Sequence, residues 1–419
     1  MNELLRSRTR VLVTGLGAVT PAGKSVSEFW DSMLAGHSGI NRITFFDTTD
    51  FPCKLAGEIP EFVPADFMDR KAARRMGRFS QLMVAAAREA LLDSALDLEG
   101  QNLERIGVLV GNGGGGYPGI QEAAHTLFER GGMRIDPLFF SKQLANMAGA
   151  QVAMQFGLRG YNGTVVTACA AGTQAIGEAS LMIRSGRVDV VLAGGCEAGI
   201  SELGLAGFCV MKAVTSFDGD PTKASRPFDA DRDGFVPCEG AGALLLESEE
   251  HALQRGAPIY GEVAGFGCTS DAFHVVAPPE GGEGAARAMQ EALDDAGVDK
   301  EAVGYINAHA TSTPAGDTAE TSAIKTVFGE RAYQVPISAT KSLIGHGLGA
   351  SGGMETVAAI KTLETGLAHP TINLETSDPT CDLDYIPEGQ RRIDPQAVLK
   401  NSFGFGGQNS CLVLARYEP

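Results

Sequence analysis

One cysteine of the chain lies in a local sequence suited to nucleophilic catalysis. Cys169 lies in the run TACAAG, after a β-rich stretch and before a sequence typical of a helix. This order predicts a strand-to-helix turn, where the first amides of the helix favour a thiolate and lower the pKa of the thiol. Small neighbours leave room for a substrate carbonyl, and the Cys169 amide can donate to its oxyanion. A buried structural cysteine is the alternative interpretation.

Two histidines and a lysine occupy turns of a similar kind. His309 ends a strand in the run NAHATSTP, and His346 follows Lys341 in the glycine-rich run KSLIGHG. Neutral imidazoles can donate to a developing enolate or accept a proton. Lys341 and Glu355 can form a buried pair that sets the local field, or merely a structural salt bridge. A lone histidine is more often structural, so a catalytic interpretation depends on these turns meeting in space.

A loop rich in glycine and phenylalanine precedes the last expected strand. The run NSFGFGGQN covers residues 401–409. Its glycines permit an unusual backbone, and its aromatic rings can gate an apolar channel. A tight turn with two core phenylalanines is the alternative.

Elements that could position these turns alternate along the chain. Helices are expected near residues 27–34 and 74–95, and strands at 10–15, 106–111 and in the runs YNGTVVTA, VDVVLAGG and GALLLES. Alternating helices and strands indicate an α/β fold rich in parallel strands. The run GLGAVT at residues 15–20 begins like a dinucleotide fingerprint, but Thr20 replaces its third glycine, so a turn is the preferred interpretation.

The chain resembles itself in two places. Residues 88–112 resemble 290–309, and residues 165–186 resemble 336–366, in the same order. A tandem duplication with a junction near 250–260 is therefore favoured over coincidence, with halves at 1–255 and 256–419. Cys169 and Lys341 occupy nearly the same place in the repeated unit. Equivalent turns would then meet between the halves, a common place for ligand sites.

Composition restricts the partners and the compartment. The formal net charge of -17 argues against nucleic acid and anionic membranes. The 8 cysteines form no CxxC pair and no zinc-finger spacing, so we expect no metal and a reducing, cytoplasmic compartment. The first fifteen residues lack the apolar region of a signal peptide. No apolar run approaches the length of about 18 residues that spans a membrane.

With these motifs taken together, the chain resembles the β-ketoacyl-acyl-carrier-protein (ACP) synthases of the thiolase superfamily, in the type I/II branch and most like synthase II. The similar blocks span the whole chain and keep their order. They are VLVTGLGAVTPAG, the turn around Cys169, SRPFDADRDGFVPCEGAG, NAHATSTPAGD, ATKSLIGHGLGASG and NSFGFGGQN. The resemblance implies a thiolase-like fold with a duplicated five-layered α-β-α-β-α arrangement. It also implies an acyltransferase that elongates fatty acyl chains by decarboxylative Claisen condensation of malonyl-ACP.

The resemblance assigns roles to individual residues. The nucleophile is Cys169, the active-site histidines are His309 and His346, and the lysine is Lys341 with Glu355 as its carboxylate partner. Further roles are an oxyanion hole from the amides of Cys169 and Phe403, a gate at Phe405, pantetheine contacts at Thr311 and Thr313, and an acyl-pocket position at Gly114. No cofactor is implied, because the substrates, acyl-ACP and malonyl-ACP, are carried on the phosphopantetheine of ACP. A homodimer is expected.

Docking of the acidic carrier protein needs local positive charge on an acidic enzyme. Lys71, Arg74, Arg75 and Arg78 have the spacing of one helical face. The resemblance places ACP contacts on the first three and on Lys212. An ordinary solvated charged face is the alternative.

Departures from the family pattern leave other functions open. Ala310 replaces the usual glycine after the first histidine, which adds strain if its φ is positive. Gly114 replaces a bulky residue and could open the acyl pocket. The alternatives are a type II polyketide ketosynthase, a non-catalytic chain-length or partner subunit, and a Cys-His hydrolase. The intact Cys169 and both histidines oppose the non-catalytic subunit.

Overall fold

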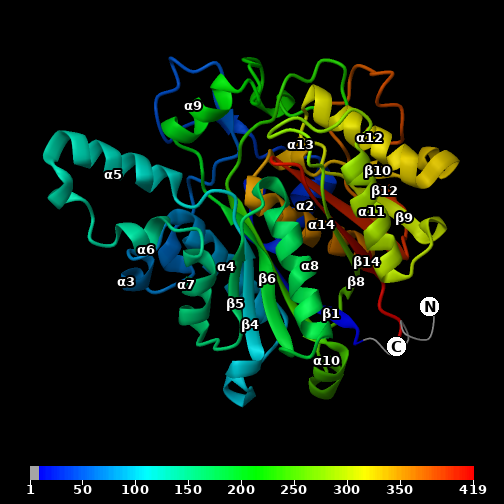
Figure 1. The fold of residues 1–419 in the computed structure, drawn as a ribbon, viewed down its shortest axis with the longest axis horizontal. Coiled ribbons are helices and arrows are strands. Elements are labelled where there is room, and N and C mark those ends of the chain that lie inside the picture. Colours follow the sequence, from blue (N-terminus) through cyan, green and yellow to red (C-terminus); the bar gives the residue numbers. More distant parts are fainter. Residues whose placement is uncertain (1–8) are drawn as a thin grey trace.

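The strands of the protein form one large mixed sheet in the computed structural model, which describes residues 9–419 (Figure 1). The expectation that the first fifteen residues lack a signal peptide falls partly on residues 1–8, which lie outside the described residues. Across the sheet the strands follow the order β10 (Ile337–Ser338), β9 (Val303–Asn307), β13 (Ala397–Gly404), β14 (Gln408–Ala415), β8 (Gly261–Ser270), β1 (Val11–Val19), β7 (Gly240–Ser248), β6 (Val190–Glu197), β4 (Ile106–Gly111) and β5 (Asn162–Val165). Two small sheets pair β2 (Asn41–Arg42) with β3 (Leu55–Ala56) and β11 (Leu367–Ala368) with β12 (Arg391–Arg392).

The two halves of this sheet have the same topology. Starting from the centre, β1, β7, β6, β4 and β5 in one direction correspond to β8, β14, β13, β9 and β10 in the other. In each half the last strand in chain order is antiparallel to both of its neighbours, the first strand on one side and β6 or β13 on the other. The two outer pairs of each half are parallel. The strands of one half end at Ser248 and those of the other begin at Gly261. This topology supports the proposed duplication with its junction near 250–260.

Helices cover the sheet in further layers. α4 (Arg78–Asp93) and α7 (Met147–Phe156) lie on the outer side of one half, and α11 (Glu283–Ala296) and α12 (Pro314–Phe328) on the outer side of the other. Between the halves, α8 (Ala171–Arg184) and α14 (Ser351–Thr365) contact each other and strands of both halves. The remaining helices are α2 (Val26–Ala35), α3 (Arg70–Ala73), α5 (Tyr117–Arg130), α6 (Phe139–Gln143), α9 (Glu202–Val210), α10 (Glu249–Arg255) and α13 (Lys341–Ile344). The arrangement has the five α-β-α-β-α layers that the resemblance implies.

Glycines bring the two central helices and their flanking turns into backbone contact. A Cβ atom added to Gly352 would lie 2.2 Å from the backbone nitrogen of Thr173, and one added to Gly349 would lie 2.4 Å from that of Gly113. A Cβ atom on Gly195 in β6 would meet the carbonyl oxygen of Gly349 at 2.2 Å. Any side chain at these positions would therefore push the two halves apart.

Two local predictions are wrong. The run GLGAVT is part of strand β1 rather than a turn, and its glycines serve close packing, since a Cβ atom on Gly17 would lie 1.9 Å from the carbonyl oxygen of Ala86 in α4. The helix expected from residue 74 begins only at Arg78, because α3 ends after one turn and Gly77 starts α4.

The apolar core forms on both sides of the sheet and between the halves. Among residues 9–419, every helix is too short or too polar to cross a lipid bilayer.

Candidate active site

Cys169 lies at the turn that leads into the central helix α8. The turn follows β5 and contains a short 3₁₀ segment, Ala168–Ala170, directly before Ala171 starts the helix. Ala168 has a φ of 48°, a left-handed conformation that costs energy for a residue with a side chain. Gly404 packs against this turn, and a Cβ atom there would lie 2.7 Å from the carbonyl oxygen of Thr167. The predicted strand-to-helix turn is confirmed, and the loop after β13 closes over it.

His346 is the closest polar partner of the cysteine. Its Nε2 atom lies 3.0 Å from Cys169 Sγ, and its Nδ1 atom lies 3.0 Å from Ser351 Oγ. Ser351 Oγ also accepts a hydrogen bond from the backbone N–H of Gly347 at 2.9 Å. Because a hydroxyl can either accept from Nδ1 or donate to it, Ser351 can support both tautomers of the neutral imidazole. No sequence pattern singled out Ser351, and only its three-dimensional position reveals a role for it.

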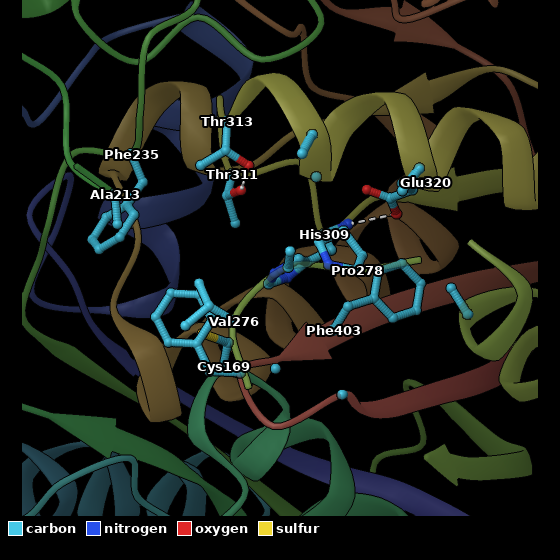
Figure 2. A pocket seen from close by; sticks show the side chains of 18 of the residues that line it. Cys169, Ala213, Phe235, Val276, Pro278, His309, Thr311, Thr313, Glu320 and Phe403 are labelled. Atoms are coloured by element: carbon cyan, nitrogen blue, oxygen red, sulfur yellow. Dashed lines mark hydrogen bonds between the residues drawn. The ribbon is translucent and has the colours of Figure 1, made fainter. Parts of the chain in front are cut away.

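His309 is held from both sides by buried charged groups. Glu320 accepts from the backbone N–H of His309 at 2.9 Å and from that of Ala310 at 2.7 Å (Figure 2). Lys341 Nζ donates to the carbonyl oxygen of His309 at 2.5 Å and lies 3.3 Å from its Nδ1 atom. An ammonium group has only donors, so Nδ1 is the acceptor and the proton of the neutral ring lies on Nε2. Ala310 has a φ of 35°, so the residue in place of the family's glycine is strained as expected.

A buried charged network lies beneath the histidines. Lys341 forms an ion pair with Glu355, and both side chains are buried. A second buried lysine, Lys400, lies 2.8 Å from the other oxygen of Glu355. The predicted pairing of Lys341 with Glu355 is present, whereas Lys400 was missed because its run in the sequence, AVLKNSF, resembles an ordinary strand.

Burial controls the protonation of the site. It raises the pKa of the Cys169 thiol to about 11, against the smaller opposing effects of the Lys341 charge and the Phe405 backbone N–H. The expected lowering of this pKa by the start of the helix is therefore wrong. Burial and the nearby lysine charges hold the pKa values of His309 and His346 well below 6.5. Both imidazoles are neutral at physiological pH.

The backbone donors at the sulfur differ in part from the expected pair. The N–H groups that act on Cys169 Sγ are those of Phe405 and of Cys169 itself. Phe403, the expected second donor, instead places its ring 5.7 Å from the ring of His309. The structure thus favours Phe405 over Phe403 as the second amide of an oxyanion hole. The two phenylalanines are separated by Gly404, so residue order alone could not choose between their amides.

A pocket of about 330 Å³ leads from the surface to Cys169. Thr311 and Thr313 line one wall of the pocket, and their hydroxyl oxygens are 2.9 Å apart (Figure 2). Val276 and Pro278 also line the pocket, near Cys169 and Phe403 (Figure 2). Both threonines therefore lie where a polar arm that enters the pocket would pass, as the resemblance implies. Phe405 also lines this pocket, and Lys212 lies exposed at its edge.

Gly114 does not leave an open space. A Cβ atom there would lie 2.2 Å from the ring of Tyr117, which occupies the volume next to the glycine. Tyr117 lines a second, small cavity together with Leu205 and Phe208, on the far side of His346. Glu197 borders the same cavity and accepts from the backbone N–H of Gly113 at 2.7 Å. Burial raises its pKa to about 7.

The basic residues at 71–78 do not share one helical face. Lys71 lies in α3, Arg74 ends this helix, and Arg75 lies in the turn before α4. All three remain exposed. Arg78 points elsewhere and forms a 2.6 Å ion pair with buried Glu239. The predicted common face is wrong, but three of the four charges still face solvent on one short segment.

The described residues, 9–419, contain no group of three or more His, Cys, Asp or Glu side chains with the geometry of a metal site.

The duplicated sheet, with the nucleophile turn in one half and the histidine turns in the other, defines a condensing enzyme of the thiolase-like fold. Two family models cover most of the chain: the N-terminal domain of beta-ketoacyl synthase matches residues 8–252, and its C-terminal domain matches residues 260–375. The chain belongs to the beta-ketoacyl synthase family.

Individual relatives agree with this assignment. The chain is 46% identical to the 3-oxoacyl-acyl-carrier-protein synthase 2 of Synechocystis sp., over 98% of this chain and 99% of the relative. A structure of the ishigamide ketosynthase/chain length factor matches with a TM-score of 0.93 and 37% identity, over 98% of this chain and 100% of that one. A type II polyketide ketosynthase solved in complex with its acyl carrier protein matches with a TM-score of 0.89 and 35% identity, over the same shares.

The raised pKa of the Cys169 thiol predicts how this residue reacts with an alkylating reagent. Because only the thiolate reacts, the alkylation rate of Cys169 should rise about tenfold per pH unit between about pH 7 and 9, without a plateau. Mass spectrometry of the peptide that contains Cys169 measures this rate separately from that of exposed Cys268. A plateau below pH 8 would show instead that the helix start dominates.

Proposed function

We propose that the protein extends fatty acyl chains by two carbons, through decarboxylative condensation of malonyl-ACP with an acyl group on Cys169. The observation that carries this proposal is the 3.0 Å contact between Cys169 Sγ and His346 Nε2 at the base of a pocket that also contains His309. The name and identity of the Synechocystis relative support the fatty acyl substrate.

The first half-reaction transfers the acyl group to the enzyme. The thiol proton of Cys169 passes to His346 Nε2, and Sγ attacks the thioester carbon of acyl-ACP. The backbone N–H groups of Cys169 and Phe405 stabilise the oxyanion that forms. The bond between this carbon and the phosphopantetheine sulfur then breaks, and the leaving thiolate takes the proton from His346.

The second half-reaction forms the new carbon–carbon bond. Malonyl-ACP enters along Thr311 and Thr313, its carboxylate leaves as CO₂, and the bonding electrons form an enolate. The enolate oxygen accepts hydrogen bonds from Nε2–H of His309 and of His346. For this step His346 first exchanges its Nδ1 proton for one on Nε2 through water, after which Ser351 donates to Nδ1. The enolate carbon attacks the acyl carbonyl on Cys169, the bond to Sγ breaks, and the thiolate takes a proton from water. The scheme needs no cofactor besides the phosphopantetheine of ACP.

Acyl carrier protein is the macromolecular partner that this chemistry requires. We place its dock on exposed Lys71, Arg74, Arg75 and Lys212, the last of which lies at the pocket edge. The protein has a net charge of -17, so it repels an acidic partner over most of its surface. Only a local cluster of basic residues can attract such a partner. The relative solved with its carrier protein supports a partner of this class.

A second copy of the chain would cover the open edge of the sheet. β5 is an edge strand, and unpaired strand edges promote association. The nearby segment from α5 to α7 carries exposed apolar side chains: Phe128, Met133, Phe140 and Met154, with Val166 just after β5. Pairing of β5 with its copy about a twofold axis would bury this surface, so we propose a homodimer in the cytoplasm.

A polyketide ketosynthase is the second candidate, because one solved relative is the ketosynthase of a type II polyketide system. It would use the same residues on different acyl chains. The products therefore separate the two functions better than any inspection of the site.

Product profiling tests the proposed reaction. With malonyl-ACP and acyl-ACPs of increasing length, we expect an acyl adduct on Cys169 and products longer by two carbons, both read by mass spectrometry. Cys169→Ala should lose the adduct and the condensation together. His309→Ala should keep the adduct and lower condensation by about a hundredfold or more, since it removes an enolate donor. Adduct without extension in the wild-type protein would favour the polyketide alternative, and no adduct would refute the proposal.

The position of Tyr117 predicts control of chain length. Tyr117→Ala should allow Cys169 to accept acyl chains longer by about two carbons, because removing the ring opens the cavity beside Gly114. The measurement is the length cutoff of adduct formation with a series of acyl-ACPs. Tyr333→Ala, on an exposed tyrosine, is the matched control. An unchanged cutoff would place the end of the acyl chain elsewhere.

Charge reversal tests the dock. Arg74→Glu/Arg75→Glu should raise the KM for ACP substrates about tenfold while kcat changes little, since these charges assist encounter rather than chemistry. Arg159→Glu/Arg187→Glu makes the same change of charge on exposed residues elsewhere. Light scattering should give the mass of two chains for wild type and both variants. A KM that the Arg74→Glu/Arg75→Glu variant leaves unchanged would refute the proposed ACP dock. The mass of a single chain for the wild-type protein would refute the proposed homodimer.

A further inference from the structure

Lys400 is buried where a lysine is costly. It lies in β13, and its side chain is fully buried. A lysine is almost never fully buried without charged or hydrogen-bonding partners, because transfer of an ammonium group out of water is unfavourable. Neighbouring groups must therefore offset the free-energy cost of burying the Lys400 ammonium group. The identity of these neighbours indicates the role of Lys400.

Four oxygen atoms surround the Lys400 ammonium group. Glu355 Oε2 lies at 2.8 Å, Thr173 Oγ1 and the carbonyl oxygen of Asn401 each lie at 2.9 Å, and Ser402 Oγ is also bonded. Such a shell suits an ammonium group with three protons. Thr173 and Ser402 also bond each other at 2.8 Å, so the shell is itself connected.

Glu355 consequently lies between two lysines. One of its oxygens contacts Lys341 and the other contacts Lys400. Since Lys341 also contacts Nδ1 and the carbonyl oxygen of His309, a continuous chain of polar contacts runs from Lys400 to the imidazole. A carboxylate held at both oxygens has little freedom to rotate away from Lys341.

The same lysine contacts the elements that carry the other reacting groups. Thr173 lies in α8, four residues after Cys169, and Ser402 directly precedes Phe403 on the strand that leads to Phe405. Lys400 thus joins α14, α8 and β13 at one buried point.

We propose that Lys400 is a positioning residue of the condensation half-reaction, which fixes Glu355 so that Lys341 stays against His309 Nδ1 and which adds positive charge beside both histidines. This inference rests on the proposed roles of His309 and His346. Lys400 touches neither substrate nor reacting atoms and acts only through Glu355 and through its field.

The charges around the histidines indicate the direction of its effect. Besides Lys400 on β13, the titratable groups that face this region are Lys341 on α13, Glu355 on α14, Glu320 on α12, Glu197 on β6, Tyr305 on β9, His369 and the thiols of Cys169, Cys238 and Cys411. The positive charge of Lys400 disfavours a proton on His309 and on His346, and so lowers their pKa values further. Removing it should therefore let the imidazoles take up protons at a higher pH.

Lys400→Met tests the inference, because it removes the charge but keeps most of the volume. Condensation and malonyl-ACP decarboxylation are measured from about pH 5 to 9. We expect the acidic limb of both profiles to move up by about one pH unit, which is a tenfold loss at a pH on this limb. Acylation of Cys169 by acyl-ACP near pH 8 should persist.

Lys400→Gln separates position from charge and remains informative if the methionine variant folds poorly. Its amide can still donate to Glu355, so we expect a condensation rate near pH 8 closer to that of the wild type than the methionine variant gives, with the acidic limb still displaced. Lys361→Met is the matched control, since Lys361 lies on the surface side of the same helix, α14, and pairs with Glu364. Its profile should equal that of the wild type.

Two results would overturn the inference. An equal loss at every pH in both Lys400 variants, with the limb unmoved, would show that the lysine only supports packing. Wild-type rates in both would show that it has no role. Absence of condensation by the wild-type protein would instead refute the proposed function, so the two failures are distinguishable.

Discussion

Backbone contact between the two central helices is the constraint on which the site depends. Glycines at 172, 349 and 352 let the turn that carries Cys169 approach the turn that carries His346 without intervening side chains. The two residues are 177 positions apart in sequence, yet their side chains are 3.0 Å apart. Each half positions one of them on its own strands, and only the close contact of the halves brings them into reach. The glycines thus determine the distance over which a proton must move.

Burial of the side chains at this junction determines its electrostatics. Full burial opposes a charge on the thiol and on both imidazoles, so all three are neutral before substrate enters. In the proposed mechanism, the thiolate therefore forms only during the reaction, when the proton of Cys169 moves to His346. The permanent charges lie one layer deeper, on Lys341, Glu355 and Lys400, where they orient the polar groups without contacting the pocket.

Sequence patterns predicted the features that depend on local order and missed those that depend on long-range contacts. The turn around Cys169, the strand at 106–111 and the duplicated topology follow from periodicity and repetition, which act over short stretches. The raised thiol pKa was not predictable, because burial is a property of the whole fold. Lys400 escaped notice because two of its four partners, Thr173 and Glu355, come from distant segments of the chain. The choice of Phe405 over Phe403 depends on the path of a glycine-rich loop, which residue order does not determine.

The duplication has a consequence for how this site could have arisen. Cys169 follows β5 and Lys341 follows β10, so equivalent turns of the two halves carry the proposed nucleophile in one half and a buried lysine in the other. A symmetric ancestor with two identical units would have presented two equivalent turns to one cavity. Specialisation of these turns made the copies interdependent, since each now lacks what the other retains. Recombination between the halves of distant homologues would therefore have to preserve these glycine contacts before the turns of Cys169 and His346 could meet again.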